Sequence, residues 1–271
     1  MEKIIKYFKD KSFFCLFIII LLLCLYNAYT FFQRYNILAI ENVTSFSFWN
    51  YMRVYGVGEL IMFFSPIAIL ILGINKIYKK ITTSFLEFEL MRTEYKPKMF
   101  KELILCYFKG SILFIVISII IFVIGLILFP SDLSVLTYRD YLTYFPDEAM
   151  TNPFLYVFLY HILILLFCMF VINIGLIVMY YIKDFILIVI ASFITLNGIN
   201  FILGNVILFI AKIVNNEKFI EYAYDVNVYE GYMVQGTIGQ AFIDIGILYI
   251  ISLIIVMILY RNKEKVVMRF D

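Results

Sequence analysis

The feature that most constrains this chain is a set of six apolar runs, each long enough to cross a lipid bilayer. A helix needs about 20 apolar residues to cross the hydrocarbon core, and helices satisfy their own backbone groups there. Hydrophobic residues make up 64% of the chain and charged residues 15%, unlike a soluble domain. We therefore predict an all-α polytopic membrane protein, a single transmembrane domain over residues 1–271. The spans cover about residues 12–32, 59–77, 110–129, 153–181, 185–214 and 240–260.

Several features refine this layout. The basic leader Met1 to Lys11 precedes a run too long for the core of a signal peptide, so we interpret this run as a retained first span. Pro66 is expected to kink the second span. The segment 33–58 holds the single tryptophan, Trp49, among several tyrosines, and this composition predicts a loop at the membrane interface.

The distribution of basic residues predicts the orientation. If the amino terminus is cytoplasmic, the inside segments carry 17 lysines and arginines and the outside loops carry four. This asymmetry follows the positive-inside rule and places both termini in the cytoplasm. The predicted cytoplasmic region is 78–109, and the predicted outside loops are 33–58, 130–152 and 215–239.

The stretch from Lys76 to Lys109 concentrates charge between the second and third spans. It contains eight of the 22 lysines and arginines together with four acids. Ser84 and Glu87 form a capping-box pattern, which predicts a short amphipathic helix from about Phe85. Pro97 disfavours a helical conformation at Lys96 and should end this helix. A second apolar pattern then runs without interruption into the third span.

Two interpretations fit this stretch. Its helices could lie on the lipid headgroups, with the lysines attracted to anionic lipid. Alternatively, its mixture of acids, bases and aromatic residues forms a docking surface for a soluble partner. The candidate docking residues are Phe85, Glu87, Phe88, Glu89, Met91, Arg92, Glu94, Tyr95, Pro97 and Lys101.

Polar residues within the spans are the other candidates for function, because they usually face a bundle interior or a cavity. Asn197, Asn200, Gly204 and Asn205 share one face of the fifth span. This face is either a helix-packing surface or the wall of a substrate pathway, and packing is favoured because asparagines and small residues stabilise helix contacts.

Catalytic motifs are missing from the sequence. It contains neither the glycine-rich phosphate loop of ATP-binding proteins nor the HExxH motif of zinc proteases. The single histidine, His161, fits a hydrogen-bonded residue of the bundle better than a catalyst. The cysteines Cys15, Cys24, Cys106 and Cys168 show no metal-ligand spacing and fit small apolar packing residues. We therefore expect no enzymatic activity, no catalytic residue, no metal site and no bound cofactor in this chain.

The layout resembles the ABC type-2 exporter permeases. The likeness covers most of the chain in topology, and its motif is confined to about residues 84–109. Glu87, Glu89 and Glu94 match the family's acids, Arg92 and Pro97 its basic-proline element, and Lys101 the lysine before the third span. In that family this stretch forms the coupling helix that docks on a separate ATPase.

The resemblance implies a mechanism and a set of partners. Cytosolic ABC ATPase subunits would bind ATP and magnesium, and their closure would move the coupling helices of two permease subunits, identical or related. We expect a multi-pass protein of a bacterial cell membrane, which has lipid as a partner and does not bind nucleic acid. The expected cargo is a hydrophobic or amphipathic substrate, with antimicrobial peptides favoured by the compact outside loops.

Two alternatives to an exporter permease also fit the sequence. A non-transporting scaffold or sensor could use the same stretch to dock a soluble cytosolic regulator. A secondary carrier is disfavoured, because few acids lie at mid-membrane depth and no internal repeat is visible.

Overall fold

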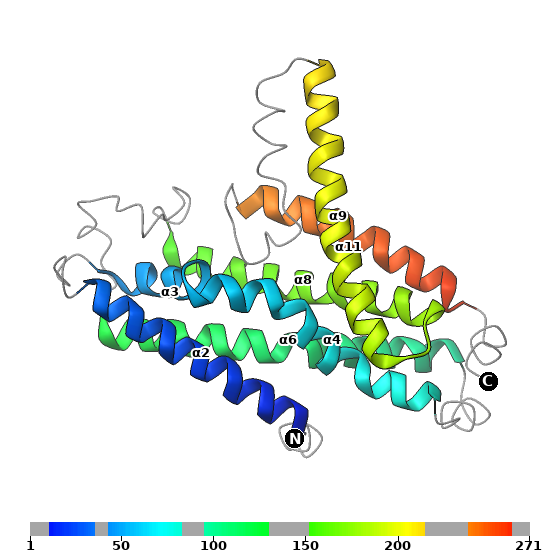
Figure 1. Cartoon of the computed structure of the whole chain (residues 1–271), viewed down its shortest axis with the longest axis horizontal. Helices are drawn as coiled ribbons and strands as arrows, with labels where there is room; N and C mark the ends of the chain where they lie inside the picture. The colour runs from blue at the N-terminus through cyan, green and yellow to red at the C-terminus, as the bar shows by residue number, and fades with distance from the viewer. Residues whose placement is uncertain (1–10, 36–42, 83–94, 130–151, 215–237, 262–271) are drawn as a thin grey trace.

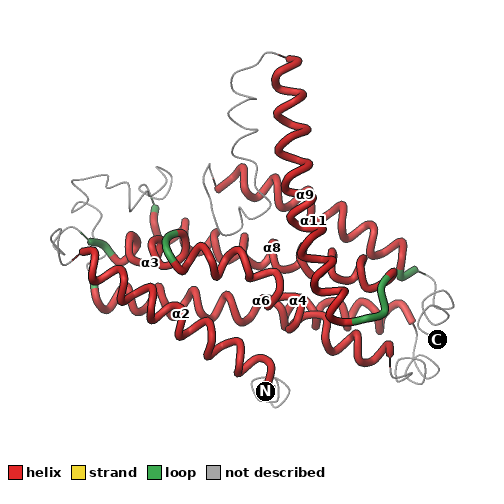
Figure 2. Tube along the Cα trace, in the orientation of Figure 1, coloured by secondary structure: helices red, strands yellow, loops and turns green. Residues whose placement is uncertain are grey.

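The structure is a computed structural model, and it describes residues 11–35, 43–82, 95–129, 152–214 and 238–261. These residues form helices without any strand (Figure 2). Six of the helices are long and apolar enough to cross a membrane, which confirms the prediction of an all-helical chain with six candidate spans. The helices are α2 (Lys11–Tyr35), α3 (Ser45–Val54), α4 (Val57–Thr82), α6 (Tyr95–Leu128), α8 (Pro153–Tyr181), α9 (Phe185–Val214) and α11 (Ile238–Leu259).

Helix α8 lies at the centre of the bundle and contacts α4, α6, α9 and α11. Most of its side chains from Tyr156 to Tyr180 are buried, because neighbouring helices cover it on several sides. Helix α2 packs on α3 and α4 at the edge of the bundle. Most of the long helices run alongside one another, whereas α9 crosses them steeply and extends beyond them (Figure 1).

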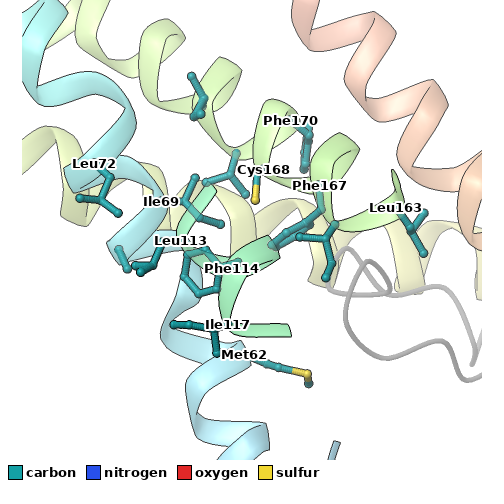
Figure 3. Packing of buried hydrophobic residues seen from close by; sticks show 14 of the residues in the cluster. Met62, Ile69, Leu72, Leu113, Phe114, Ile117, Leu163, Phe167, Cys168 and Phe170 are labelled. Carbon is teal, nitrogen blue, oxygen red and sulfur yellow. The ribbon is translucent and has the colours of Figure 1, made fainter. Parts of the chain in front are cut away.

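The core forms where α4, α6 and α8 meet. Figure 3 shows Ile69 of α4, Leu113 of α6 and Phe167 of α8 packing together, and all three are fully buried. Glycines allow the close approach of these helices: a Cβ atom on Gly110 would lie 2.6 Å from Cδ1 of Ile172, and one on Gly175 would overlap the side chain of Leu70. Small residues at crossings are the usual means by which membrane helices gain packing contacts.

Helix α4 continues through Pro66, where a kink was expected. Proline has no N–H to donate to the carbonyl four residues earlier, which here belongs to Met62. The hydroxyl of Ser65 donates to that carbonyl oxygen at 2.7 Å. A neighbouring side chain thus replaces the missing backbone bond, as is common in membrane helices.

The prediction that 33–58 is an interfacial loop is wrong for its described second half, which contains helix α3. Thr44 caps this helix: its side chain accepts the Ser47 N–H at 3.1 Å, and the Ser47 hydroxyl oxygen accepts the Thr44 N–H at 3.0 Å. Trp49 and Phe46 have no exposed surface. Trp49 is therefore a core residue, with no exposed surface left to form an aromatic belt.

Asn27 of α2 fixes the turn between α3 and α4. Its side-chain amide donates to the carbonyl oxygen of Tyr55 at 3.1 Å, and its Oδ1 accepts the Val57 N–H at 3.2 Å. Gly56 between them has φ of 60°, a conformation that favours glycine. The turn and the inserted α3 are thus held by a buried polar group of another helix.

Helix α6 begins at Tyr95 and runs to Leu128 without interruption, so the predicted continuity into the third span is confirmed. Pro97 lies in its first turn, where the N–H groups lack intrahelical partners and the missing one costs little. Lys96 is helical, so the predicted non-helical conformation at this residue is wrong. The expected short helix before Pro97 falls on residues 83–94, which lie outside the described residues.

Candidate docking site at the basic end of the helix bundle

One end of the bundle gathers the basic residues of four separate segments. Helices α4 and α11 end there, α6 begins there, and the turn between α8 and α9 closes it (Figure 1). The Tyr78 hydroxyl of α4 donates to the carbonyl oxygen of Lys183 in that turn at 3.0 Å. The described basic residues at this end are Lys76, Lys79, Lys80, Lys96, Lys98, Lys101, Lys183 and Arg261.

A buried carboxylate joins two of these segments. Oε1 of Glu102 in α6 lies 2.7 Å from Nζ of Lys80 in α4 and 3.9 Å from Nζ of Lys98. The Glu102 and Lys80 side chains are only 7% and 13% exposed. A charge with so little exposure needs a charged or hydrogen-bonding partner, because its desolvation is otherwise unfavourable. The ion pair thus fixes the end of α4 against the start of α6, on either side of residues 83–94.

The structure describes only part of the predicted docking surface. Tyr95, Pro97 and Lys101 lie in the first two turns of α6, and the Lys101 side chain is exposed. The other predicted residues, Phe85, Glu87, Phe88, Glu89, Met91, Arg92 and Glu94, lie outside the described residues. Docking by this stretch therefore stays a prediction, and the described geometry supplies the two helices that flank it.

The predicted asparagine face lies on α9. The side-chain amides of Asn197 and Asn205 donate to the carbonyl oxygens of Phe193 and Phe201, each one turn earlier, at 2.8 and 2.7 Å. Asn205 is exposed, and Asn200 and Gly204 are half-buried. These bonds hold two of the amides to their own helix, and the packing and pathway roles of the face stay predictions.

A polar network that the sequence analysis missed links three helices near the basic end. Asn173 of α8 has no exposed surface. Its Oδ1 accepts the Tyr107 hydroxyl of α6 at 2.5 Å, and its Nδ2 donates to the Ser252 hydroxyl of α11 at 3.0 Å. One asparagine thus connects α6, α8 and α11. The available signal was an amide in the middle of an otherwise apolar run.

A second buried cluster lies toward the other end of the bundle. The guanidinium carbon of Arg53 in α3 lies 3.4 Å from the ring centroid of Tyr160 and 4.3 Å from that of Trp49. Arg53, which was counted among the outside bases, is only 7% exposed. Stacking on two aromatic faces stabilises a cation that has lost most of its water. The Trp49 indole also donates to the Ser118 hydroxyl at 3.3 Å.

His161 lies beside this cluster. Its Nδ1 is 2.7 Å from the carbonyl oxygen of Val157, and since a carbonyl only accepts, this nitrogen carries the proton. The prediction that His161 is a hydrogen-bonded residue of the bundle is confirmed. Within the described ranges, no three His, Cys, Asp or Glu side chains lie close enough to hold a metal ion.

Comparison of the chain with protein-family models, curated proteins and solved structures gives no match.

Proposed function

We propose that this chain is the membrane subunit of an ATP-driven exporter of the ABC type-2 kind. It moves a hydrophobic or amphipathic substrate, in our proposal a peptide, out of a bacterial cell or its membrane. The chain itself binds no nucleotide and catalyses no reaction. ATP and magnesium bind to separate cytosolic ATPase subunits, and a second permease subunit completes the assembly.

The observation that carries this proposal is the ion pair between Lys80 and Glu102. It fixes the two helices that flank residues 83–94, the segment in which the resemblance places the coupling helix. A coupling element must transmit force into the bilayer, and a rigid attachment at both of its ends allows this. A segment that only covers lipid headgroups needs no such attachment.

Helix α6 provides a route for this force. It is one continuous helix of 34 residues, about 50 Å at 1.5 Å per residue, and so reaches from the proposed docking region across the bilayer. Asn173 ties α6 to α8 and α11 within the bundle. In our proposal, closure of the ATPases displaces the start of α6, and the linked helices follow.

The proposal is tested by purifying the tagged full-length chain from its native cells in mild detergent, with and without crosslinking through Lys96 and Lys98. We expect a phosphate-loop ATPase to co-purify in stoichiometric amount, as identified by mass spectrometry. Arg92→Glu should abolish this association, because it reverses a charge at the proposed contact. Lys212→Glu, at an exposed base near the far end of α9, is the matched control and should leave it unchanged.

A different result would favour the alternative function, a scaffold or sensor that docks a soluble regulator. If the crosslinked chain is recovered alone, or with a regulator that lacks a nucleotide site, the exporter proposal is wrong. ATP-dependent substrate flux in proteoliposomes containing both subunits is the second test, since a scaffold would not support it.

A further inference from the structure

An apolar groove opens between α6 and α11 at the basic end of the bundle. Its volume is about 530 Å³, within the range of small-molecule sites. Buried side chains of four helices form its floor, among them Ile77, Leu103, Leu176 and Val256. Its walls are open to the surroundings: Phe100 of α6 is 59% exposed and Met257 of α11 is 58% exposed.

The groove combines an apolar body with a cationic end. Arg261, just beyond the end of α11, is the one charged side chain among the described residues that line it. Lys98 and Lys101 flank the lining residues Met99 and Phe100 in sequence. Glu102, next to the lining residue Leu103 in sequence, is paired with Lys80 at 2.7 Å and with Lys98 at 3.9 Å, so Arg261 and Lys101 carry the charge that this acid does not offset.

The position of the groove specifies an amphiphile as its occupant. It runs along α11 from Leu253 to Arg261, about 12 Å at 1.5 Å per residue. Arg261 marks the level at which the apolar part of the helix ends, which corresponds to the boundary between hydrocarbon and headgroups. A transmembrane helix of a partner would need a surface along the roughly 30 Å of the hydrocarbon core, so this groove is too short for one.

We propose that this groove binds an anionic phospholipid, with an acyl chain between α6 and α11 and the phosphate beside Arg261. The membrane provides this ligand in the adjacent leaflet. Basic residues at a membrane surface attract anionic headgroups, and each Lys or Arg raises the binding constant about fivefold. The proposal concerns lipid recognition by this chain and does not depend on its function as an exporter.

The test measures lipid retention by the purified full-length chain with native mass spectrometry. The probes are phosphatidylglycerol and phosphatidylcholine with identical palmitoyl and oleoyl chains, each added to delipidated protein. We expect at least fivefold stronger retention of phosphatidylglycerol by the native chain. Arg261→Gln should reduce this preference about fivefold, whereas Lys212→Gln, an exposed base outside the groove, should leave it intact.

A second pair of variants tests the apolar part of the site. Met257→Trp fills the groove and should reduce retention of both lipids. Ile255→Trp is the matched control, because Ile255 lies on the same helix at the same depth, is 40% exposed and does not line the groove. Equal retention by these two variants would contradict the groove as the site.

Photocrosslinking keeps the proposal testable if a variant fails to fold. A phosphatidylglycerol with a diazirine in its acyl chain should label peptides that contain Phe100 and Met257 in the native chain. Labelling elsewhere, or equal retention of the two lipids by the native chain, overturns the proposal. Protection of the groove by another segment of the chain, seen as lack of labelling in nanodiscs, would do the same.

Discussion

Breaking the ion pair between Lys80 and Glu102 should destabilise the end of the bundle at which α4 and α6 meet. Exposed ion pairs contribute about 0.2–1 kcal/mol, and removing one partner of a fully buried pair costs about 3–5 kcal/mol. These side chains are 13% and 7% exposed, and the lysine stem can carry its charge toward solvent. We therefore expect Glu102→Gln to cost about 2 kcal/mol, between the two limits.

This cost is measurable as a change in thermal stability. Each kcal/mol corresponds to a shift in Tm of about 2–4 °C for chains of 150–250 residues, so Glu102→Gln should lower the Tm by about 4–8 °C. The assay is thermal unfolding in detergent, followed by the loss of the monodisperse peak in size-exclusion chromatography. Lys76→Gln, which removes an exposed base one turn earlier in α4, is the control and should shift the Tm by less than about 2 °C.

A double-mutant cycle isolates the interaction between the two side chains. If they form a pair, Lys80→Gln and Glu102→Gln together should cost less than the sum of their separate effects, by about 1–2 kcal/mol. Exchange of the two charges, Lys80→Glu with Glu102→Lys, should restore part of the lost stability. Additive effects in the cycle, or a Glu102→Gln variant as stable as the native chain, would refute the reasoning.

Two further predictions concern the core. Asn173→Leu removes two interhelical hydrogen bonds and should lower the free energy of unfolding by about 1–2 kcal/mol, and Tyr107→Phe should cost less in this variant than in the native chain, since its bond to Asn173 is already gone. The same unfolding assay applies, and an equal cost of Tyr107→Phe in the two backgrounds would contradict the network. Gly175→Ala should cost about 1–3 kcal/mol by overlap with Leu70, whereas Gly239→Ala, where a Cβ meets nothing within 4 Å, should not be destabilising. Equal Tm values for these two glycine variants would show that the helices can separate without cost.

The long helices could be predicted because their signal is local. A run of about 20 apolar residues has few alternatives to a membrane helix. The structure adds the contacts that depend on neighbouring residues. At Pro66, for example, the hydroxyl of Ser65 donates a hydrogen bond to the carbonyl oxygen of Met62. Lys96 was expected to be non-helical, but α6 includes both Lys96 and Pro97, because proline in a first turn does not prevent a helix.

Helix α3 could not be predicted from composition. Its sequence mixes polar, basic and aromatic residues, which equally suit a membrane interface. Its burial depends on contacts with distant segments: Trp49 reaches Ser118 of α6, and Arg53 stacks on Tyr160 of α8. Only the capping pair Thr44 and Ser47 gives a local sign of a helix there.

The partners of the charged and polar residues at the basic end could not be predicted from the sequence either. Glu102 stands among several bases in the sequence, and nothing local indicates that its partner is Lys80, 22 residues away. Asn173 is similar, because its two partners come from helices 66 and 79 residues distant in the chain. Sequence patterns identify such residues as unusual, and only the fold identifies what they bind.

Helix α9 shows that the position of a helix depends on the lipid and protein around it. Its 30 residues span about 45 Å, more than the roughly 30 Å of the hydrocarbon core. It crosses the other long helices steeply (Figure 1), whereas helices in a bilayer are tilted by about 0–40°. Its exposed Phe201 and Phe209 require cover from lipid or from another protein. Since α9 is apolar on most sides, its pattern specifies a helix without specifying a neighbour.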